Sequence, residues 1–227
     1  MPGVGVNISP VDGGVPSGGD YDFLSHANLV IRYNAETSAF TSGDVIAADG
    51  QDVVTWKNER SGDTTPELSQ STPSQRPVMR KGANGLNNLG FVQFNESNSE
   101  NIFKSSTSYS DLNTNTQTRF CVAKFDNTPP SSSDVAYSMG YASNTNLDGM
   151  FLSTNKLYQH TRNTSAVQMR GIHEDDVVAG TWYVFAFRSN GTAVETWISG
   201  TPADTLENTG TMDSHASFNA LYLGRNI

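Results

Sequence analysis

The stretch that decides the fold is Trp182-Tyr183-Val184-Phe185-Ala186-Phe187, six consecutive aromatic or aliphatic residues. Aromatic and β-branched residues favour strands, and a short apolar run that ends at a turn is typical of a central strand. The turn is Ser189-Asn190-Gly191, which favours a tight hairpin, and residues 193–198 then return as a second strand. These residues predict an antiparallel pair at the centre of a sheet.

Outward from this pair, short apolar or alternating segments recur between Gly, Asn, Ser and Asp residues. Within residues 117–125, period two predicts that Arg119, Cys121 and Ala123 lie on one face of a strand. No window of useful length shows helical spacing with caps, so we expect an all-β antiparallel sandwich or barrel. Further strands are predicted at residues 29–33, 53–56, 91–94, 157–162, 168–170 and 220–223.

The composition excludes several classes of protein. Ser, Thr and Asn contribute 69 of the 227 residues and charged residues only 16%, which excludes a coiled coil built from Ala, Glu, Lys, Leu and Arg. No apolar run reaches the roughly 18 residues of a membrane-spanning helix. The net charge of −9 argues against nucleic-acid binding, which requires a basic surface. We therefore expect neither a membrane nor a nucleic acid as partner.

The amino-terminal residues 1–22 differ from the rest of the chain because they are rich in Gly and Pro, which disfavour regular structure. We predict an extended attachment arm over residues 1–22, either disordered or laid along a partner, and a single sandwich over residues 23–227. The arm begins at Met1 and lacks the basic and apolar regions of a signal peptide. The single cysteine, Cys121, cannot form an intrachain disulfide, and we predict that it is buried as a small apolar group.

Several segments follow one another in a recognisable order: residues 29–35, Val54 to Asp63, Gln70 to Thr72, Arg76-Pro77, residues 91–95, residues 181–184, the Gly191 hairpin, residues 197–200 and Leu221 to Arg225. This order resembles the concanavalin A-like lectin/glucanase superfamily, in its laminin-G-like bacterial and phage branch, with Asn58 where that family usually has Asp. The resemblance implies a two-sheet antiparallel jelly-roll β-sandwich, a fold that hosts lectins, hydrolases and structural modules alike.

One departure from the resemblance concerns the last strand. Related domains continue past the Tyr-x-Gly-Arg segment with a strand that closes a sheet, whereas this chain stops at Ile227. An unpaired sheet edge attracts other strands. We therefore expect the edge to be covered by the amino-terminal arm, by a neighbouring subunit, or by a continuation of the chain.

Catalytic residues are not predicted. Glucanases of the resembled superfamily carry Glu-x-Asp-x-x-Glu on one strand, where period two projects the carboxylates to one face as glycoside hydrolysis needs, and no such run occurs here. The acidic cluster Glu174-Asp175-Asp176 reads as a solvated turn. We therefore predict that the chain is not an enzyme, and a polysaccharide hydrolase is the least favoured alternative.

Candidate ligand-binding residues lie on three predicted strands, where residues two apart share a face. If these strands are neighbours, their aromatic and planar polar side chains form a patch suited to a saccharide or a protein; the alternative is that the aromatic rings point into the core. The candidates are Tyr158, His160 and Arg162 on the first strand, Gln168 and Arg170 on the second, and Glu195 and Trp197 on the third.

A calcium ion is the one cofactor that the sequence leaves open. Asn144, Asn146 and Asp148 place oxygen-bearing side chains at alternate positions before Gly149, which resembles the start of an oxygen-ligand loop. Position twelve of that frame is Asn155 rather than a bidentate Glu, so the segment is not an EF-hand. The alternative is a turn rich in Asn and Gly.

Three classes of function remain: a virion surface component of a bacteriophage (capsid decoration, knob or short fibre), a free lectin-like carbohydrate-binding module, and a hydrolase. Phage proteins assemble in the cytoplasm and leave by lysis, which fits a chain with one cysteine and no signal peptide. We therefore predict localisation in the virion. The expected partners are a phage capsid or tail protein bound through the arm, a cell-surface glycan, and further copies of the chain in a homo-oligomer.

Overall fold

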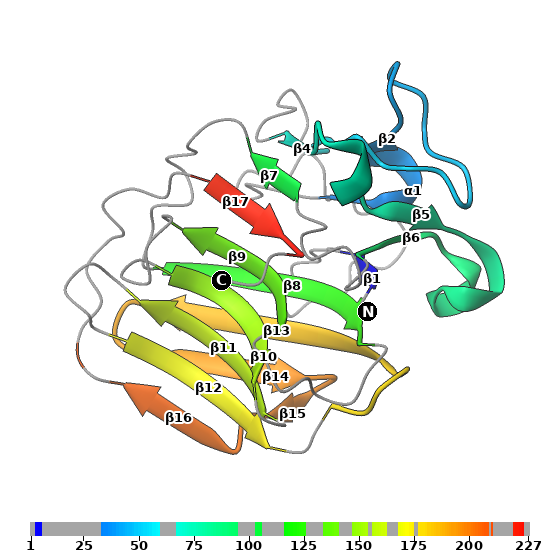
Figure 1. The fold of residues 1–227 in the computed structure, drawn as a ribbon. Coiled ribbons are helices and arrows are strands. Elements are labelled where there is room, and N and C mark those ends of the chain that lie inside the picture. Colours follow the sequence, from blue (N-terminus) through cyan, green and yellow to red (C-terminus); the bar gives the residue numbers. More distant parts are fainter. Residues whose placement is uncertain are drawn as a thin grey trace, which may run out of the picture.

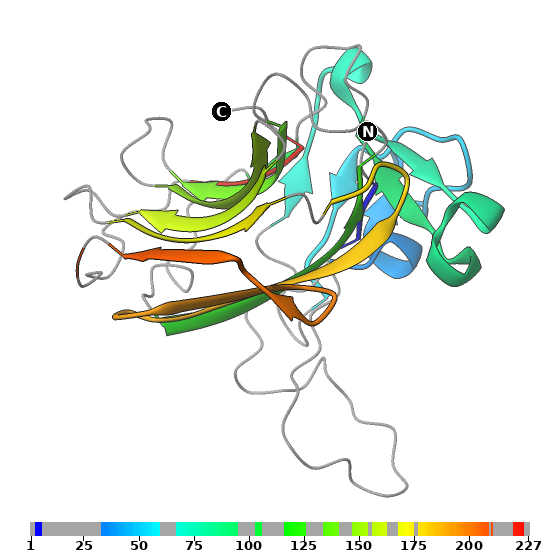
Figure 2. The same cartoon turned by 90° about the horizontal axis from the view of Figure 1, so that it is seen from below.

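Two antiparallel β-sheets stack face to face and form a sandwich (Figures 1 and 2). The computed structural model of the chain describes the following residues: 3–5, 33–59, 67–94, 103–105, 116–125, 134–140, 147–153, 156–162, 168–174, 177–208, 210 and 220–224. All strand pairs among these residues are antiparallel. The predicted two-sheet antiparallel sandwich is confirmed.

The first sheet has seven strands among the described residues. Its order is β15 (Thr201–Pro202), β14 (Val194–Ile198), β13 (Trp182–Asn190), β8 (Thr116–Lys124), β1 (Gly3–Gly5), β6 (Phe91–Gln93) and β5 (Val78–Arg80). The predicted central hairpin of residues 182–198 is present as β13 and β14.

The second sheet has ten strands in the part of the chain that the structure describes. Its order is β16 (Thr205–Asn208), β12 (Gln168–Glu174), β11 (Lys156–Arg162), β10 (Leu147–Ser153), β9 (Asp134–Gly140), β17 (Ala220–Leu223), β7 (Phe103–Ser105), β4 (Leu68–Ser69), β3 (Thr55–Trp56) and β2 (Ala39–Phe40). Of the predicted strand over residues 29–33, residues 29–32 lie outside the described residues and Tyr33 is not part of a strand.

Among the described residues, the helices are short turns in the lobe at the right of Figure 1. They are α1 (Ala35–Ser38) and the 3-10 turns η2 (Pro73–Gln75), η3 (Gly82–Asn84) and η4 (Leu86–Asn88). The Asn34 side chain caps α1 by accepting a hydrogen bond from the Glu36 N–H. Asn is a favoured N-cap residue, but a helix of four residues is too short to show helical spacing in the sequence. No helix among the described residues is long and apolar enough to cross a membrane.

Alternation along β8 and β13 places one side of each strand in the core. Cys121 and Ala123 are buried, as is Phe125 just beyond β8, and the Phe125 ring meets that of Phe185 edge-on at 6.1 Å between centroids. The predicted burial of Cys121 is confirmed, and burial raises the pKa of its thiol to about 12 because the charged thiolate is poorly solvated there. Val184, next to Phe185, is 43% exposed, so β13 has one buried and one open face.

Two of the tryptophans occupy different environments. Trp56 is fully buried, and its ring contacts those of Tyr33 and Phe103 at 5.7 and 6.2 Å between centroids. Its indole N–H donates to the Asn34 carbonyl at 3.2 Å. Trp182 is only half-buried, with its ring 5.2 Å from that of Phe91. The start of the longest apolar run is therefore less enclosed than the run itself suggests.

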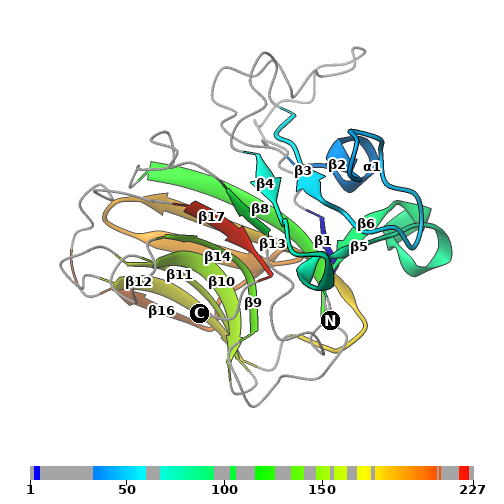
Figure 3. The same cartoon turned by 45° about the horizontal axis from the view of Figure 1, so that its top comes forward.

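The amino-terminal residues Gly3–Gly5 form a strand inside the first sheet (Figure 3). Val4 lies opposite Ala123 of β8 on one side and Val92 of β6 on the other. The strand that contains Leu221 and Tyr222 is β17, which is paired on both sides, with β9 and β7. The expectation that the arm, a neighbouring subunit or further chain covers an edge beside this strand is wrong, because β7 occupies that position.

Candidate functional site

The outer side of the second sheet carries five of the seven predicted ligand-binding residues. Strands β11 and β12 are neighbours, with Tyr158 opposite Ile172, His160 opposite Arg170 and Arg162 opposite Gln168. Directly opposed residues of an antiparallel pair share a face, so Tyr158, His160, Arg162, Gln168 and Arg170 occupy register positions on one face. The inward positions of β11 are Leu157, Gln159 and Thr161, all buried, which identifies this shared face as the outer one.

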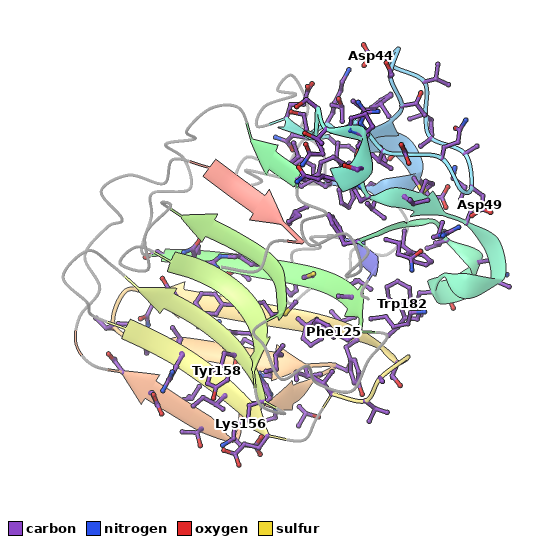
Figure 4. The ribbon with its side chains drawn as sticks, viewed as in Figure 1. Asp44, Asp49, Phe125, Lys156, Tyr158 and Trp182 are labelled. Carbon is purple, nitrogen blue, oxygen red and sulfur yellow. The ribbon has the colours of Figure 1, made fainter. Side chains whose placement is uncertain are left out.

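A charged and aromatic cluster is built on this outer face, and we call it the platform: Lys156, Tyr158, Arg170, Glu174 and Glu207. Figure 4 labels two of its members, Lys156 and Tyr158. Arg170 lies over the Tyr158 ring, 5.3 Å from its centroid, and its Nε donates to a Glu207 carboxylate oxygen at 2.6 Å. Lys156 and Glu174 form an ion pair at 2.5 Å. The guanidinium is thus held on two sides, which lowers the conformational cost of using it to bind a ligand.

The segment that supplies most of the platform residues is basic, whereas the chain as a whole is acidic. Residues 156–170 contain Lys156, Arg162 and Arg170 but no Asp or Glu, in a chain of net charge −9. The acidic platform residues Glu174 and Glu207 lie at the end of β12 and on the edge strand β16. Guanidinium and ammonium groups are hydrogen-bond donors only, so this face offers donors to hydroxyl, carboxylate or sulfate oxygens of a ligand.

The other two predicted residues, Glu195 and Trp197, do not join the platform. They share the outer face of β14, since Val194, Thr196 and Ile198 are the buried residues of that strand. However, β14 belongs to the first sheet, so the predicted single patch is wrong for this strand. The chain crosses between the sheets after β12, and the outer faces of the two sheets point to opposite sides of the sandwich.

A buried polar contact joins the sheets beneath the platform, and sequence reasoning missed it. His173 of β12 and Thr196 of β14 are both buried, and the His173 Nε2 lies 3.0 Å from the Thr196 hydroxyl. The Gln159 side-chain amide donates to the Trp197 carbonyl at 3.4 Å. A Cβ built on Gly171 would overlap the Thr196 hydroxyl, so Gly171 permits the close approach of the two sheets. Alternation along residues 168–174 places Gly171 and His173 on the same side of the strand, and this pattern could have indicated a close polar contact there.

The predicted calcium ligands are distributed over a boundary of the described residues. Asn144 and Asn146 lie outside these residues, whereas Asp148 is a residue of β10, in register with Thr161 and Met139. Within the described part of the chain, no group of three or more His, Cys, Asp or Glu side chains is arranged to hold a metal ion. The calcium site stays a prediction.

Comparison with known proteins finds likeness in fold only. No protein-family model and no curated protein sequence matches the chain. Among solved structures, mouse laminin alpha1 chain domains LG4-5 match with a TM-score of 0.38 and 13% identity, over 53% of this chain and 32% of that chain. The botulinum neurotoxin serotype G binding domain matches with a TM-score of 0.36 and 13% identity, over 78% of this chain and 44% of that chain.

This chain spans less than half the length of either matched structure. The description of this chain as a sandwich rests on the order and pairing of its own strands.

Proposed function

We propose that the chain is a non-catalytic binding protein that contacts a cell-surface glycan through the platform. The observation that carries this proposal is the Tyr158–Arg170–Glu207 arrangement, in which an aromatic ring, a guanidinium and a carboxylate are fixed side by side on one face of a sheet. Saccharides present both hydroxyl groups and apolar ring faces. Aromatic side chains with an apolar body and a polar tip, beside fixed hydrogen-bonding groups, suit such a ligand.

The arrangement of acidic groups supports binding rather than hydrolysis. Glycoside hydrolysis needs one carboxyl group as proton donor and a second as nucleophile or base, held on either side of the scissile bond. On the platform, each carboxylate is instead paired with a cation: Glu174 with Lys156, and Glu207 with Arg170. We expect no release of reducing sugar from β-glucans or alginate. Turnover that is lost in Glu174→Gln or Glu207→Gln would contradict a purely binding role.

A glycan array probed with the full chain tests the binding proposal. We expect binding to a subset of neutral or acidic glycans, and a loss of about tenfold or more in affinity for Tyr158→Ala and for Arg170→Gln. The matched control is Lys57→Gln, which removes a cation from an exposed ion pair with Asp44, 2.9 Å away, in the lobe that Figure 4 shows apart from Tyr158. Binding that is unchanged in both platform variants would overturn the proposal.

The biological setting that we propose is the surface of a bacteriophage particle, where the chain serves as a capsid decoration, knob or short fibre. The composition, rich in Ser, Thr and Asn with a net charge of −9, suits an exposed soluble surface. The single cysteine is a buried free thiol, as suits folding in a reducing cytoplasm. Labelling of purified particles with an antibody to the chain tests this setting, and particles that lack the chain would contradict it.

Attachment through the amino-terminal arm needs a test that spares β1. Deletion of residues 1–22 would also remove Gly3–Gly5 from the first sheet. Replacement of residues 6–22 by a Gly-Ser segment of equal length keeps β1 and removes the arm's own side chains. We expect this variant to fold with unchanged thermal stability but to be absent from particles. Normal incorporation into particles would show that the arm does not attach the chain.

A further inference from the structure

An apolar surface lies on the outer side of the first sheet, opposite the platform. Val184 and Ala186 of β13 lie beside Val122 and Phe120 of β8, and Trp197 of β14 lies on the other side of Ala186. We call these five residues the apolar strip. Their burial places them on the outer face: Val184 is 43% exposed and the other four are half-buried, whereas their strand neighbours Cys121, Phe185, Phe187 and Ile198 are buried.

The apolar strip is unusual for a chain of this composition. The outer face of an antiparallel sheet is ordinarily polar, and contiguous apolar surface marks a site of interaction. Here the strip crosses three adjacent strands in a chain with a mean hydropathy of −0.44. A partner that covered this strip would need to present apolar groups as well.

The border of the apolar strip carries a charge pair. Arg188 of β13 lies opposite Glu195 of β14, their side chains are 61% and 50% exposed, and the Arg188 Nε lies 3.1 Å from a Glu195 oxygen. A twofold axis parallel to the strands, between β13 and β14, would lay β13 of one copy over β14 of the other. Each Arg188 would then face the Glu195 of the other copy, so the border is complementary to itself.

The next row of residues is complementary in volume under the same axis. Ala186 lies opposite Trp197, so the axis would lay the Trp197 ring of each copy over the Ala186 methyl of the other. Large and small side chains that alternate across facing sheets allow the sheets to approach to about 10 Å. Charge and volume thus agree in two adjacent rows on one axis.

We propose that two copies of this chain associate face to face through the apolar strip, about a twofold axis parallel to β13 and β14. The association leaves the platforms of both copies open on the two outer sides of the pair. It does not depend on the proposed glycan ligand, since the two surfaces lie on different sheets.

Charge reversal in separate copies tests this geometry, with sedimentation velocity of the full chain as the measurement. We expect the unaltered chain to dimerise, and Arg188→Glu and Glu195→Arg each to weaken the dimer by about tenfold or more, because like charges would then face each other. An equimolar mixture of the two variants should form a heterodimer, since one copy then presents two carboxylates in this row and the other presents two guanidinium groups. Circular dichroism verifies that each variant is folded.

Two further variants complete the design. Ala186→Arg places a charge in the apolar row, so we expect a monomer that mixing does not restore. Arg170→Glu on the platform makes the same charge change on the other sheet and should leave the dimer unchanged. A monomeric unaltered chain at high micromolar concentration would overturn the proposal in favour of a different occupant, such as a saccharide stacked on Trp197 or another protein. A dimer that survives both single reversals, or a mixture that stays monomeric, would overturn the proposed axis.

Discussion

The outer faces of the two sheets differ in chemistry, although the inner faces of both sheets enclose the same core. The platform on the second sheet is built from ion pairs around one aromatic ring, whereas the apolar strip on the first sheet has the Arg188–Glu195 ion pair only at its border. A sandwich exposed only to water would be polar on both sides. This asymmetry is the basis of the two separate proposals, a polar ligand on the platform and a second copy of the chain on the apolar strip.

The largest effect on stability is expected in β13, which presents core residues on one face and residues of the apolar strip on the other. Phe185→Ala removes a buried ring that packs on Phe125 and should lower the free energy of unfolding by about 3–5 kcal/mol. Val184→Ala, one residue away on the open face, should cost less than about 1 kcal/mol. Urea denaturation of dilute, monomeric protein measures both. Equal costs would mean that Val184 is enclosed in the monomer and that the strip is not a free surface.

The spacing of the sheets beneath the platform gives the next prediction. Gly171→Ala forces the added Cβ against the Thr196 hydroxyl, so β12 and β14 must separate or shift. We expect a loss of about 1–3 kcal/mol in urea denaturation. Thr196→Ser in the same chain removes the Thr196 methyl and retains the hydroxyl that contacts His173, so it should restore little. An unchanged midpoint for Gly171→Ala would show that the sheets are loosely packed under the platform.

Trp182, the first residue of β13, should show an intermediate effect on stability when it is replaced. Its ring is half-buried, lies against Phe91 and has the Lys124 ammonium 5.5 Å from its centroid. Trp182→Ala should cost about 1–2 kcal/mol, clearly less than Phe185→Ala. Thermal denaturation followed by circular dichroism provides the comparison. A cost as large as that of Phe185→Ala would place the ring in the core.

The smallest effect on stability is expected on the platform. Arg170→Gln breaks the ion pair with Glu207, whose side chains are 29% and 39% exposed, and solvent screening limits such pairs to about 0.2–1 kcal/mol. The same change should reduce glycan binding far more than stability. If the loss of stability exceeds that of Gly171→Ala and does not fall as salt is added, the pair serves the fold rather than a ligand.

Period-two alternation in the sequence predicts much of which residues lie on the inner and outer faces of each strand. The inward side of β8, with Cys121 and Ala123, and the shared outer side of β11 and β12 follow from alternation within each strand. The sheet to which β14 belongs does not follow, because alternation distinguishes the two sides of a strand but not its partners. The hairpin predicts β13 as one partner of β14, but the sheet that this pair joins depends on the pairing of β13 with the distant strand β8.

The lobe formed by residues 33–94 is the part that sequence patterns predict least well. Its strands are two or three residues long, too short for period two to be recognised. Trp56, in one of these short strands, is nonetheless fully buried, and its ring contacts those of Tyr33 and Phe103. A large aromatic residue therefore identifies the core where strand patterns do not.

The position of β1 has a consequence for the order of folding during synthesis. Gly3 lies opposite Gln93 and Lys124, so β1 can pair on both sides only after the chain has been synthesised as far as Lys124. Contacts between such distant residues form slowly, and β6 and β8 are joined through this sheet by β1 alone among the described strands. An affinity tag fused before Gly3 would therefore sit beside a slow long-range pairing, and a carboxyl-terminal tag is the safer choice for refolding experiments.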